Sequence, residues 1–330
     1  MAKHEWTLDE WKDLEAEINV NLKASTTDSD ARKVITRHAR HVMRNYTTGF
    51  FIVSRFLPKI KRDDVELIYA AVRYPDEVVD TFPISDEKKR ELLTRWRTAY
   101  AEAMQSESIT SNLGKDIPPF IAAFADLAKR HKIPAEHYVS FLDAMQFDIA
   151  PQPFETLDDL IDKYIYGSAI VVGYFLTYVY SASSPGAFDD ALESARNLGI
   201  GLQLTNFLRD IQDDARRGRV YLPQDLLRAH GIHQFNPEDT EQQVLLKSVV
   251  KAMTHIADTY YEKSFQTLNA FHPDSRIAIK ACIDVYRMLN TRIAESDLGI
   301  NHRESVPMME KLKPLPASKF WRIPLAYMVP

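Results

Sequence analysis

Helix-starting signals recur along this chain, each a capping residue or a proline followed by apolar side chains three and four positions apart. Such signals stand at Asp63, Ser85, Pro134, Thr156 and Pro273. Alternating polar and apolar runs bounded by turn residues, which would indicate strands, do not compete with them. Glycine, which hairpin turns favour, accounts for 10 of the 330 residues, well below its usual share of about 7%. The sequence therefore predicts an all-α protein.

Composition narrows the class of protein further. Neither an internal repeat nor a low-complexity linker divides the chain, so we expect a single domain over residues 1–330. Lysine and arginine total 41 against 46 acidic residues, which gives no reason to expect a nucleic acid as partner. The one cysteine, Cys282, excludes an intramolecular disulfide and suits a reducing compartment. The N-terminal stretch lacks the apolar core of a secretory signal, so we expect a cytoplasmic protein.

An uncharged segment runs from Tyr164 to Phe188 and is long enough to raise the question of a membrane span. Glycines, serines and Pro185 dilute its apolar character. A helix that is buried on all sides within a large bundle has the same composition. We interpret the segment as such a buried helix.

Two segments carry polar residues in a stripe along an otherwise apolar helix. In the first, the residues at helical offsets 0, 4, 7, 8 and 11 are Tyr69, Arg73, Asp76, Glu77 and Asp80. In the second, offsets 0, 3, 7, 10 and 11 fall on Gln203, Asn206, Asp210, Asp213 and Asp214. The flanks "ELIYAAV" and "GIGLQLTNFL" do not resemble a solvated surface.

Like charges four residues apart destabilise a helix unless a cation lies between them. A solvated acidic face would be the simplest interpretation of one such pair, but two pairs with apolar flanks predict a bound cation. Oxygen ligands suit Mg²⁺, which proteins hold through one or two carboxylates together with substrate phosphates. Arg73 lies in the first stripe, and Arg209 and Arg219 accompany the second. A glycine-rich nucleotide loop is absent from the sequence. The pattern therefore predicts a diphosphate held by Mg²⁺ between two helices.

These motifs resemble those of the squalene and phytoene synthases. "YAAVRYPDEVVD" is similar to the first aspartate-rich motif of that family, and "GLQLTNFLRDIQDDARRGRVYLP" to the second. The resemblance covers about residues 45–312, which leaves a helical extension at 1–44 and a proline-rich tail at 313–330. It implies the isoprenoid synthase fold, a single large helical bundle around a central cavity.

The resemblance also implies roles for individual residues. Asp76, Asp80, Asp210 and Asp214, with Asn206, would bind Mg²⁺ or Mn²⁺, and Tyr166 would take part in the chemistry. The positions expected to contact the substrate or its diphosphate are Thr47, Phe50, Tyr69, Arg73, Gln203, Asn206, Arg209, Arg219, Tyr221, Tyr286 and Arg303.

The activity implied is the head-to-head joining of two prenyl diphosphates through a cyclopropyl diphosphate. Phytoene formation needs no reductant, whereas squalene formation uses NADPH. Release of an apolar product would bring the protein into peripheral contact with a membrane. One departure stands out, because "TTGF" at residues 47–50 lacks the basic residue and second hydroxyl of the family at Thr48 and Gly49. This departure supports one alternative, an enzyme that ionises a single prenyl diphosphate. A separate alternative is a catalytically silent isoprenoid-binding protein, against which the four intact carboxylates argue.

Overall fold

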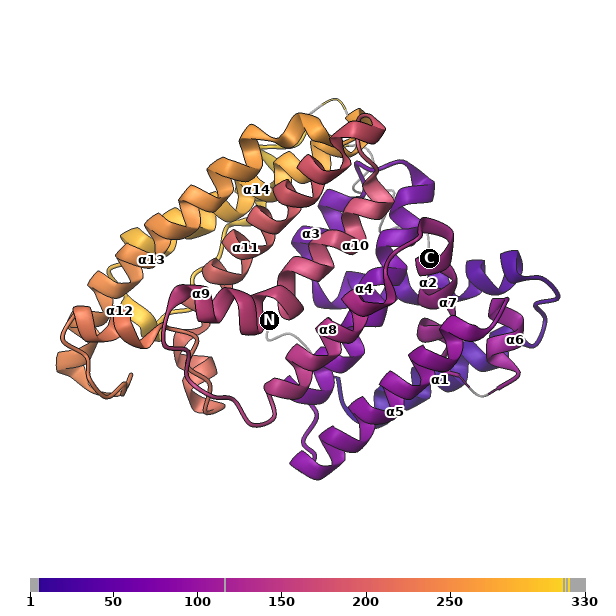
Figure 1. The fold of residues 1–330 in the computed structure, drawn as a ribbon, viewed down its shortest axis with the longest axis horizontal. Coiled ribbons are helices and arrows are strands. Elements are labelled where there is room, and N and C mark those ends of the chain that lie inside the picture. The colour runs from indigo at the N-terminus through magenta and orange to yellow at the C-terminus, as the bar shows by residue number, and fades with distance from the viewer. Residues whose placement is uncertain (1–5, 116, 317, 319, 321–330) are drawn as a thin grey trace. The chain divides into compact units, whose positions relative to one another are not determined.

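The computed structural model describes residues 6–115, 117–316, 318 and 320, except for the side chain of Thr48. Within those ranges the secondary structure is helical, apart from one isolated β-bridge between Ala182 and Phe271 (Figure 1). This confirms the all-α prediction. The helices fall into two compact units, one reaching to Ile149 and the other running over Ala150–Phe320. The single domain expected over residues 1–330 stays a prediction.

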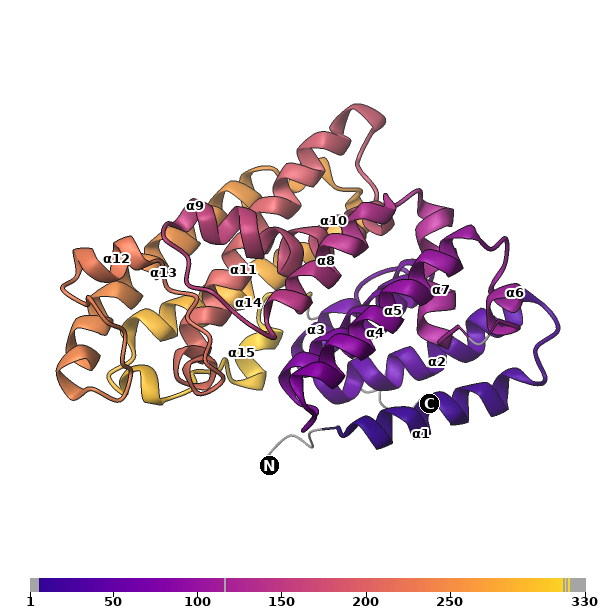
Figure 2. The same cartoon turned by 60° about the horizontal axis from the view of Figure 1, so that its bottom comes forward.

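The first unit is built around one long helix, α4. Its helices are α1 (Leu8–Leu22), α2 (Asp28–Tyr46), α3 (Thr48–Ser54), α4 (Lys59–Asp80), α5 (Asp86–Gln105), α6 (Ile109–Leu113), α7 (Pro119–His131) and α8 (Ala135–Phe147). Helix α4 contacts α2, α5, α7 and α8, and Figure 2 shows α2, α4 and α5 side by side. Large aromatic side chains fill the core between them, among them Trp11, Tyr100, Phe120, Phe124 and Tyr138. The first acidic stripe thus lies on the central helix of this unit.

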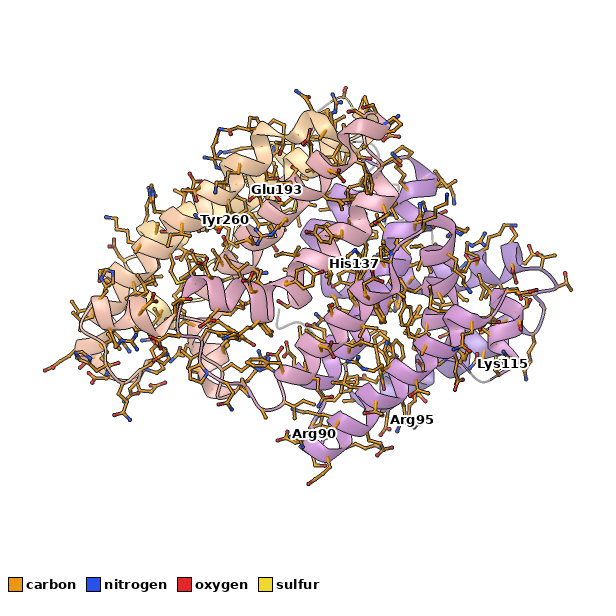
Figure 3. The ribbon with its side chains drawn as sticks, viewed as in Figure 1. Arg90, Arg95, Lys115, His137, Glu193 and Tyr260 are labelled. Atoms are coloured by element: carbon orange, nitrogen blue, oxygen red, sulfur yellow. The ribbon has the colours of Figure 1, made fainter. Side chains whose placement is uncertain are left out.

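The second unit has α11 as its central helix. Its elements are α9 (Leu157–Leu160), the π-helix η1 (Ile161–Ile170), α10 (Val171–Tyr180), η2 (Pro185–Ala187), α11 (Phe188–Arg216), α12 (Gln224–Ala229), α13 (Thr240–Gln266), η3 (Leu268–Ala270), α14 (Pro273–Glu295), η4 (Gly299–Asn301) and α15 (Met308–Leu312). Helix α11 contacts α13, α14, α10 and η1. Figure 3 labels Glu193 on α11 and Tyr260 on α13, which interact electrostatically where the two helices lie side by side. The second acidic stripe lies on the C-terminal half of α11.

Four of the five predicted helix starts are confirmed, at Ser85, Pro134, Thr156 and Pro273. The start predicted at Asp63 is wrong, because α4 begins four residues earlier at Lys59, after Pro58. The fixed φ of Pro58 suits the start of a helix. The charged stretch "KIKRDD" lacks the apolar spacing by which the first turn could have been predicted. None of the described helices is long and apolar enough to cross a membrane. Of the proline-rich tail, residues 317, 319 and 321–330 lie outside the described part of the chain.

Close packing of α11 against α13 depends on Gly201. The hydroxyl of Tyr261 on α13 donates to the carbonyl oxygen of Gly201 at 2.7 Å, and it also lies 2.7 Å from the hydroxyl of Thr205. Tyr261 is fully buried, so its ring cannot swing aside without breaking these hydrogen bonds. A Cβ atom added at Gly201 would lie 2.9 Å from Cε1 of Tyr261. This glycine therefore fixes the distance between the two helices.

We expect Gly201→Ala to lower the free energy of unfolding by about 1 to 3 kcal/mol, because overpacking forces the buried Tyr261 ring to move. Chemical denaturation followed by circular dichroism measures the change. Gly186→Ala is the matched control, since a Cβ atom there meets no neighbouring atom within 4 Å. Equal stability of the two alanine variants would contradict the packing role of Gly201.

Candidate active site

The first acidic motif follows a proline inside α4. Pro75 has no N–H, so the carbonyl of Ala71, four residues earlier, loses its helical partner. The hydroxyl of Tyr138 on α8 replaces that partner and donates to the Ala71 oxygen at 2.6 Å. Tyr138 in turn accepts a hydrogen bond of 2.8 Å from Nε1 of Trp96. The helix therefore continues through Pro75 to Asp76 and Asp80 with its backbone satisfied.

We expect Tyr138→Phe to destabilise the protein by about 2 to 4 kcal/mol, because it leaves a buried carbonyl and a buried indole N–H without partners. Thermal or chemical denaturation measures the loss. Tyr100→Phe is the control, since within the described structure the buried hydroxyl of Tyr100 has no hydrogen-bond partner. A Tyr138→Phe variant as stable as the Tyr100→Phe variant would show that the hydroxyl does not support α4.

Arg73 joins the carboxylates of the first stripe. Its Nη1 donates to Asp76 Oδ2 at 2.5 Å, and its Nη2 donates to Glu77 Oε1. Glu77 is fully buried, whereas the side chains of Arg73 and Asp76 are 26% and 33% exposed. Burial raises the pKa of Glu77 to about 7 against the opposing effect of Arg73. Nε of Arg73 and Oε2 of Glu77 are buried and find no hydrogen-bond partner among the described residues.

The remaining predicted residues of the first unit are Tyr69 and Asp80 on α4, and Thr47 and Phe50 at the start of α3. Tyr69 and Asp80 are half-buried on α4. Thr47 links α2 to α3, and its hydroxyl caps α3 by accepting a hydrogen bond of 3.3 Å from the N–H of Phe50. The hydroxyl that "TTGF" shares with the family therefore has a structural use here. The side chain of Thr48, the next residue, lies outside the described structure.

Arg55 follows α3 closely but does not replace the basic residue missing at Thr48. Its side chain is 3% exposed and forms an ion pair with the fully buried Glu66. It also donates to the Phe51 carbonyl oxygen at 3.2 Å. This guanidinium is therefore already paired in the core of the first unit and does not offer its charge to a substrate.

The second acidic motif centres on Asp210, which two arginines hold. Arg209 donates through Nε at 2.9 Å and through Nη2 at 2.5 Å, one bond to each carboxylate oxygen. Arg303, which follows η4, donates through Nε at 2.6 Å and through Nη2 at 3.4 Å. Burial alone would raise the pKa of Asp210, but the two guanidinium groups outweigh it and lower the pKa. Asp210 is thus an anion between two cations that phosphate oxygens also attract.

The neighbours of Asp210 complete a set of oxygen donors. Gln203, Asn206 and Asp214 are half-buried on the same helix. Oδ1 of Asn206 is buried and, within the described ranges, has no hydrogen-bond partner. An unsatisfied buried oxygen of this kind fits a metal ligand. Tyr286 on α14 interacts electrostatically with Arg209. The donor set of this unit therefore fits Mg²⁺.

Within the described residues, no group of three or more His, Cys, Asp or Glu side chains is placed to hold a metal ion. Mg²⁺ does not require such a group, because it usually binds to one or two carboxylates, substrate phosphates and water. The lack of such a group therefore does not count against the fit of Mg²⁺ at either motif.

Tyr164 and Tyr166 lie in the π-helix η1, and the structure distinguishes them. Tyr164 is 3% exposed, and its hydroxyl accepts a hydrogen bond of 3.1 Å from Tyr221. The ring of Tyr221 stacks on Tyr164 at 4.9 Å and on Phe207 at 4.2 Å. Tyr166, two residues further along the same helix, is half-buried. The structure thus places Tyr164, which sequence reasoning passed over, in the aromatic cluster beside the second motif.

A small pocket connects this aromatic cluster with the second motif. Its lining includes Phe207, Asp214, Arg219 and Tyr221. Arg219 is 5% exposed, so a buried guanidinium-bearing side chain shares this pocket with Asp214 and the two aromatic residues. Three residues predicted from sequence, Asp214, Arg219 and Tyr221, are therefore brought together.

Comparison with known proteins identifies the family. The squalene/phytoene synthase family model matches residues 43–313. The chain belongs to this family. The phytoene synthase of Arthrospira platensis is 27% identical over 308 residues, which make up 90% of this chain and 95% of that protein. The 4,4'-diapophytoene synthase of Staphylococcus haemolyticus is 28% identical and covers 84% of this chain and 93% of its own length.

A solved dehydrosqualene synthase with a bound ligand has the same fold, with a TM-score of 0.71 at 21% identity over 88% of this chain and 97% of that chain. The expected isoprenoid synthase fold and the predicted membership of the squalene and phytoene synthases are confirmed. The chain is a prenyltransferase of the squalene/phytoene synthase type. The roles of its individual site residues stay predictions.

Proposed function

We propose that this protein joins two prenyl diphosphates head to head in a Mg²⁺-dependent reaction, with geranylgeranyl diphosphate as substrate and phytoene as product. Farnesyl diphosphate, giving squalene or dehydrosqualene, is the second assignment. The observation that carries the proposal is the pairing in each unit of an aspartate motif with an arginine, Arg73 beside Asp76 and Arg209 beside Asp210. Membership of the squalene/phytoene synthase family supports the same reaction.

The residues that would hold Mg²⁺ or Mn²⁺ are Asp76, Asp80, Asn206, Asp210 and Asp214. When bound, the metal supplies Lewis-acid stabilisation of the leaving diphosphate. Arg73, Arg209 and Arg303 would bind diphosphate oxygens through their guanidinium edges. Because Asp210 already holds two arginines, the incoming anion finds both cations oriented.

Aromatic side chains would protect the carbocation that ionisation leaves behind. The stacked faces of Tyr164, Phe207 and Tyr221 are buried, and ring faces stabilise cations while excluding water. The double bond of the second prenyl diphosphate attacks this cation, and loss of a proton to the released diphosphate closes the cyclopropane ring. The resulting cyclopropyl diphosphate then ionises again. Phytoene or dehydrosqualene formation ends with the loss of a proton, whereas squalene formation takes a hydride from NADPH.

A second candidate function has a specific observation in its favour. Thr48 and Gly49 lack the basic residue and hydroxyl of the family, and Arg55 is committed to Glu66. An enzyme with one diphosphate site would ionise a single prenyl diphosphate and release an alcohol or a cyclic terpene.

Product analysis tests these assignments. The purified protein is incubated with Mg²⁺ and with farnesyl or geranylgeranyl diphosphate, with and without NADPH, and the hexane extract is analysed by mass spectrometry. We expect a phytoene-sized hydrocarbon from geranylgeranyl diphosphate whether or not NADPH is present. Release of diphosphate together with an uncoupled alcohol or cyclic terpene alone would favour the one-substrate enzyme.

A further inference from the structure

The start of α1 is fixed by a local sequence pattern. Thr7 caps the helix, with its hydroxyl accepting from the N–H of Glu10 at 3.2 Å while the Glu10 carboxylate accepts from the N–H of Thr7 at 2.7 Å. This reciprocal pair is a capping box, in which the residue before the cap often packs on the fourth residue of the helix. Those two residues are Trp6 and Trp11, and their ring centroids are 5.8 Å apart in an edge-to-face arrangement. The pattern "WTLDEW" therefore fixes the position of the Trp6 ring.

Trp11 is the fixed partner in this pair. Its side chain is fully buried, and its ring lies 5.2 Å from Tyr74 on α4 and 5.8 Å from Phe120 on α7. Helices α4 and α7 therefore hold Trp11, which belongs to α1, in place. Trp6, supported by Trp11, is anchored to the helix that carries the first acidic motif.

Trp6 supports Tyr46, and Tyr46 supports Arg73. The rings of Trp6 and Tyr46 lie 5.6 Å apart, and Tyr46, the last residue of α2, is 8% exposed. The Cζ atom of Arg73 lies 4.1 Å from the centroid of the Tyr46 ring, a distance typical of a cation–π contact. An aromatic column thus runs from Trp6 through Tyr46 to the Arg73 guanidinium.

The N–H groups of a guanidinium point outward in one plane, so the orientation of that plane decides where they donate. Two edges of Arg73 are used by Asp76 and Glu77, and its buried Nε has no hydrogen-bond partner within the described residues. The contact with the Tyr46 ring therefore restricts the orientations open to Arg73 and so the directions in which it donates. A long, flexible side chain without this support would sample several orientations and bind an anion less well.

We propose that Trp6 is a positioning residue of the first acidic motif: through the ring of Tyr46 it holds Arg73 in the orientation that binds the substrate diphosphate. This role rests on the proposed function, because it assumes that Arg73 meets a diphosphate. It assigns a part in substrate binding to the N-terminal segment, which precedes the matched family region of residues 43–313.

The test compares Trp6→Ala and Trp6→Leu with Trp6→Phe in the full chain. Titration calorimetry measures the binding of inorganic diphosphate in the presence of Mg²⁺, and circular dichroism confirms folding. We expect binding about tenfold weaker for the alanine and leucine variants, from loss of the ring support, and binding near that of the unaltered protein for the phenylalanine variant. Val20→Ala, at a position 61% exposed on the same helix, should bind normally. Equal binding by all variants would overturn the proposal.

A second background distinguishes positioning from general support of the fold. In an Arg73→Ala protein, Trp6→Ala should cause no further loss of diphosphate affinity, because the residue that it positions is gone. The same tenfold loss in both backgrounds would overturn the proposal. If the unaltered protein binds no diphosphate and forms no product, the proposed function fails and this role with it; if it binds diphosphate and the Trp6 variants match it, this inference alone fails.

Discussion

Asp214→Asn is expected to lower kcat/KM for the prenyl diphosphate by about 10²- to 10³-fold, and Asp80→Asn to do the same. Each change removes one negative charge from an acidic motif while keeping the shape of the side chain. The helices should persist, because both aspartates are half-buried and only one oxygen is altered. Release of diphosphate, measured at several Mg²⁺ concentrations, gives the rates, and the circular dichroism spectrum should match that of the unaltered protein.

Asp213→Asn is the control for this experiment. Asp213 precedes Asp214 on α11 and pairs with the exposed Arg216 at 3.3 Å, its own side chain being 46% exposed. We expect this variant to retain the activity of the unaltered protein. Turnover at the unaltered rate in Asp80→Asn or Asp214→Asn would contradict the proposal that these residues are metal ligands.

Glu66→Gln is expected to lower the free energy of unfolding by about 3 to 5 kcal/mol, because it leaves buried cations uncompensated. Glu66 is fully buried on α4 and accepts from Arg55, which is 3% exposed, and from Nε of Arg40 at 3.1 Å. Glutamine keeps the shape but not the charge. Chemical denaturation followed by circular dichroism measures the loss.

Two further variants serve as controls for this prediction. Glu91→Gln, which removes a carboxylate from an ion pair with Lys88 on the surface of α5, should leave the denaturation midpoint unchanged. The double variant Arg55→Met with Glu66→Leu removes both buried charges, so we expect it to be more stable than Glu66→Gln. A Glu66→Gln protein with the midpoint of the Glu91→Gln control would contradict the account of this ion pair.

Local periodicity was enough to predict which residues share each acidic stripe. Asp76 and Asp80 lie on one helix, and Asp210 and Asp214 on another, because the spacing of 3.6 residues per turn holds along α4 and α11. The fold class followed from the same periodicity and from the scarcity of glycine. The resemblance in motifs supplied the family, which the comparison over residues 43–313 confirmed.

Contacts between distant residues could not be predicted in this way. The hydroxyl of Tyr138 is 67 positions from the Ala71 carbonyl that it satisfies, although Pro75 within a helical pattern signalled that some partner was needed. Glu66 was counted among the apolar flanks, yet two arginines from other segments neutralise it. The π-helix shifts the register of its side chains by one residue per turn, so a reading at 3.6 residues per turn does not show which of Tyr164 and Tyr166 is buried.

The most direct test of the central claim is an isotope-mixing experiment. The protein is supplied with Mg²⁺ and an equal mixture of unlabelled and deuterated geranylgeranyl diphosphate. The masses of the hydrocarbon products are then measured by mass spectrometry. Head-to-head coupling predicts a light, a mixed and a heavy product in binomial proportions, because each molecule contains two prenyl chains. Light and heavy products without the mixed species would show that each product derives from one substrate and would contradict the account.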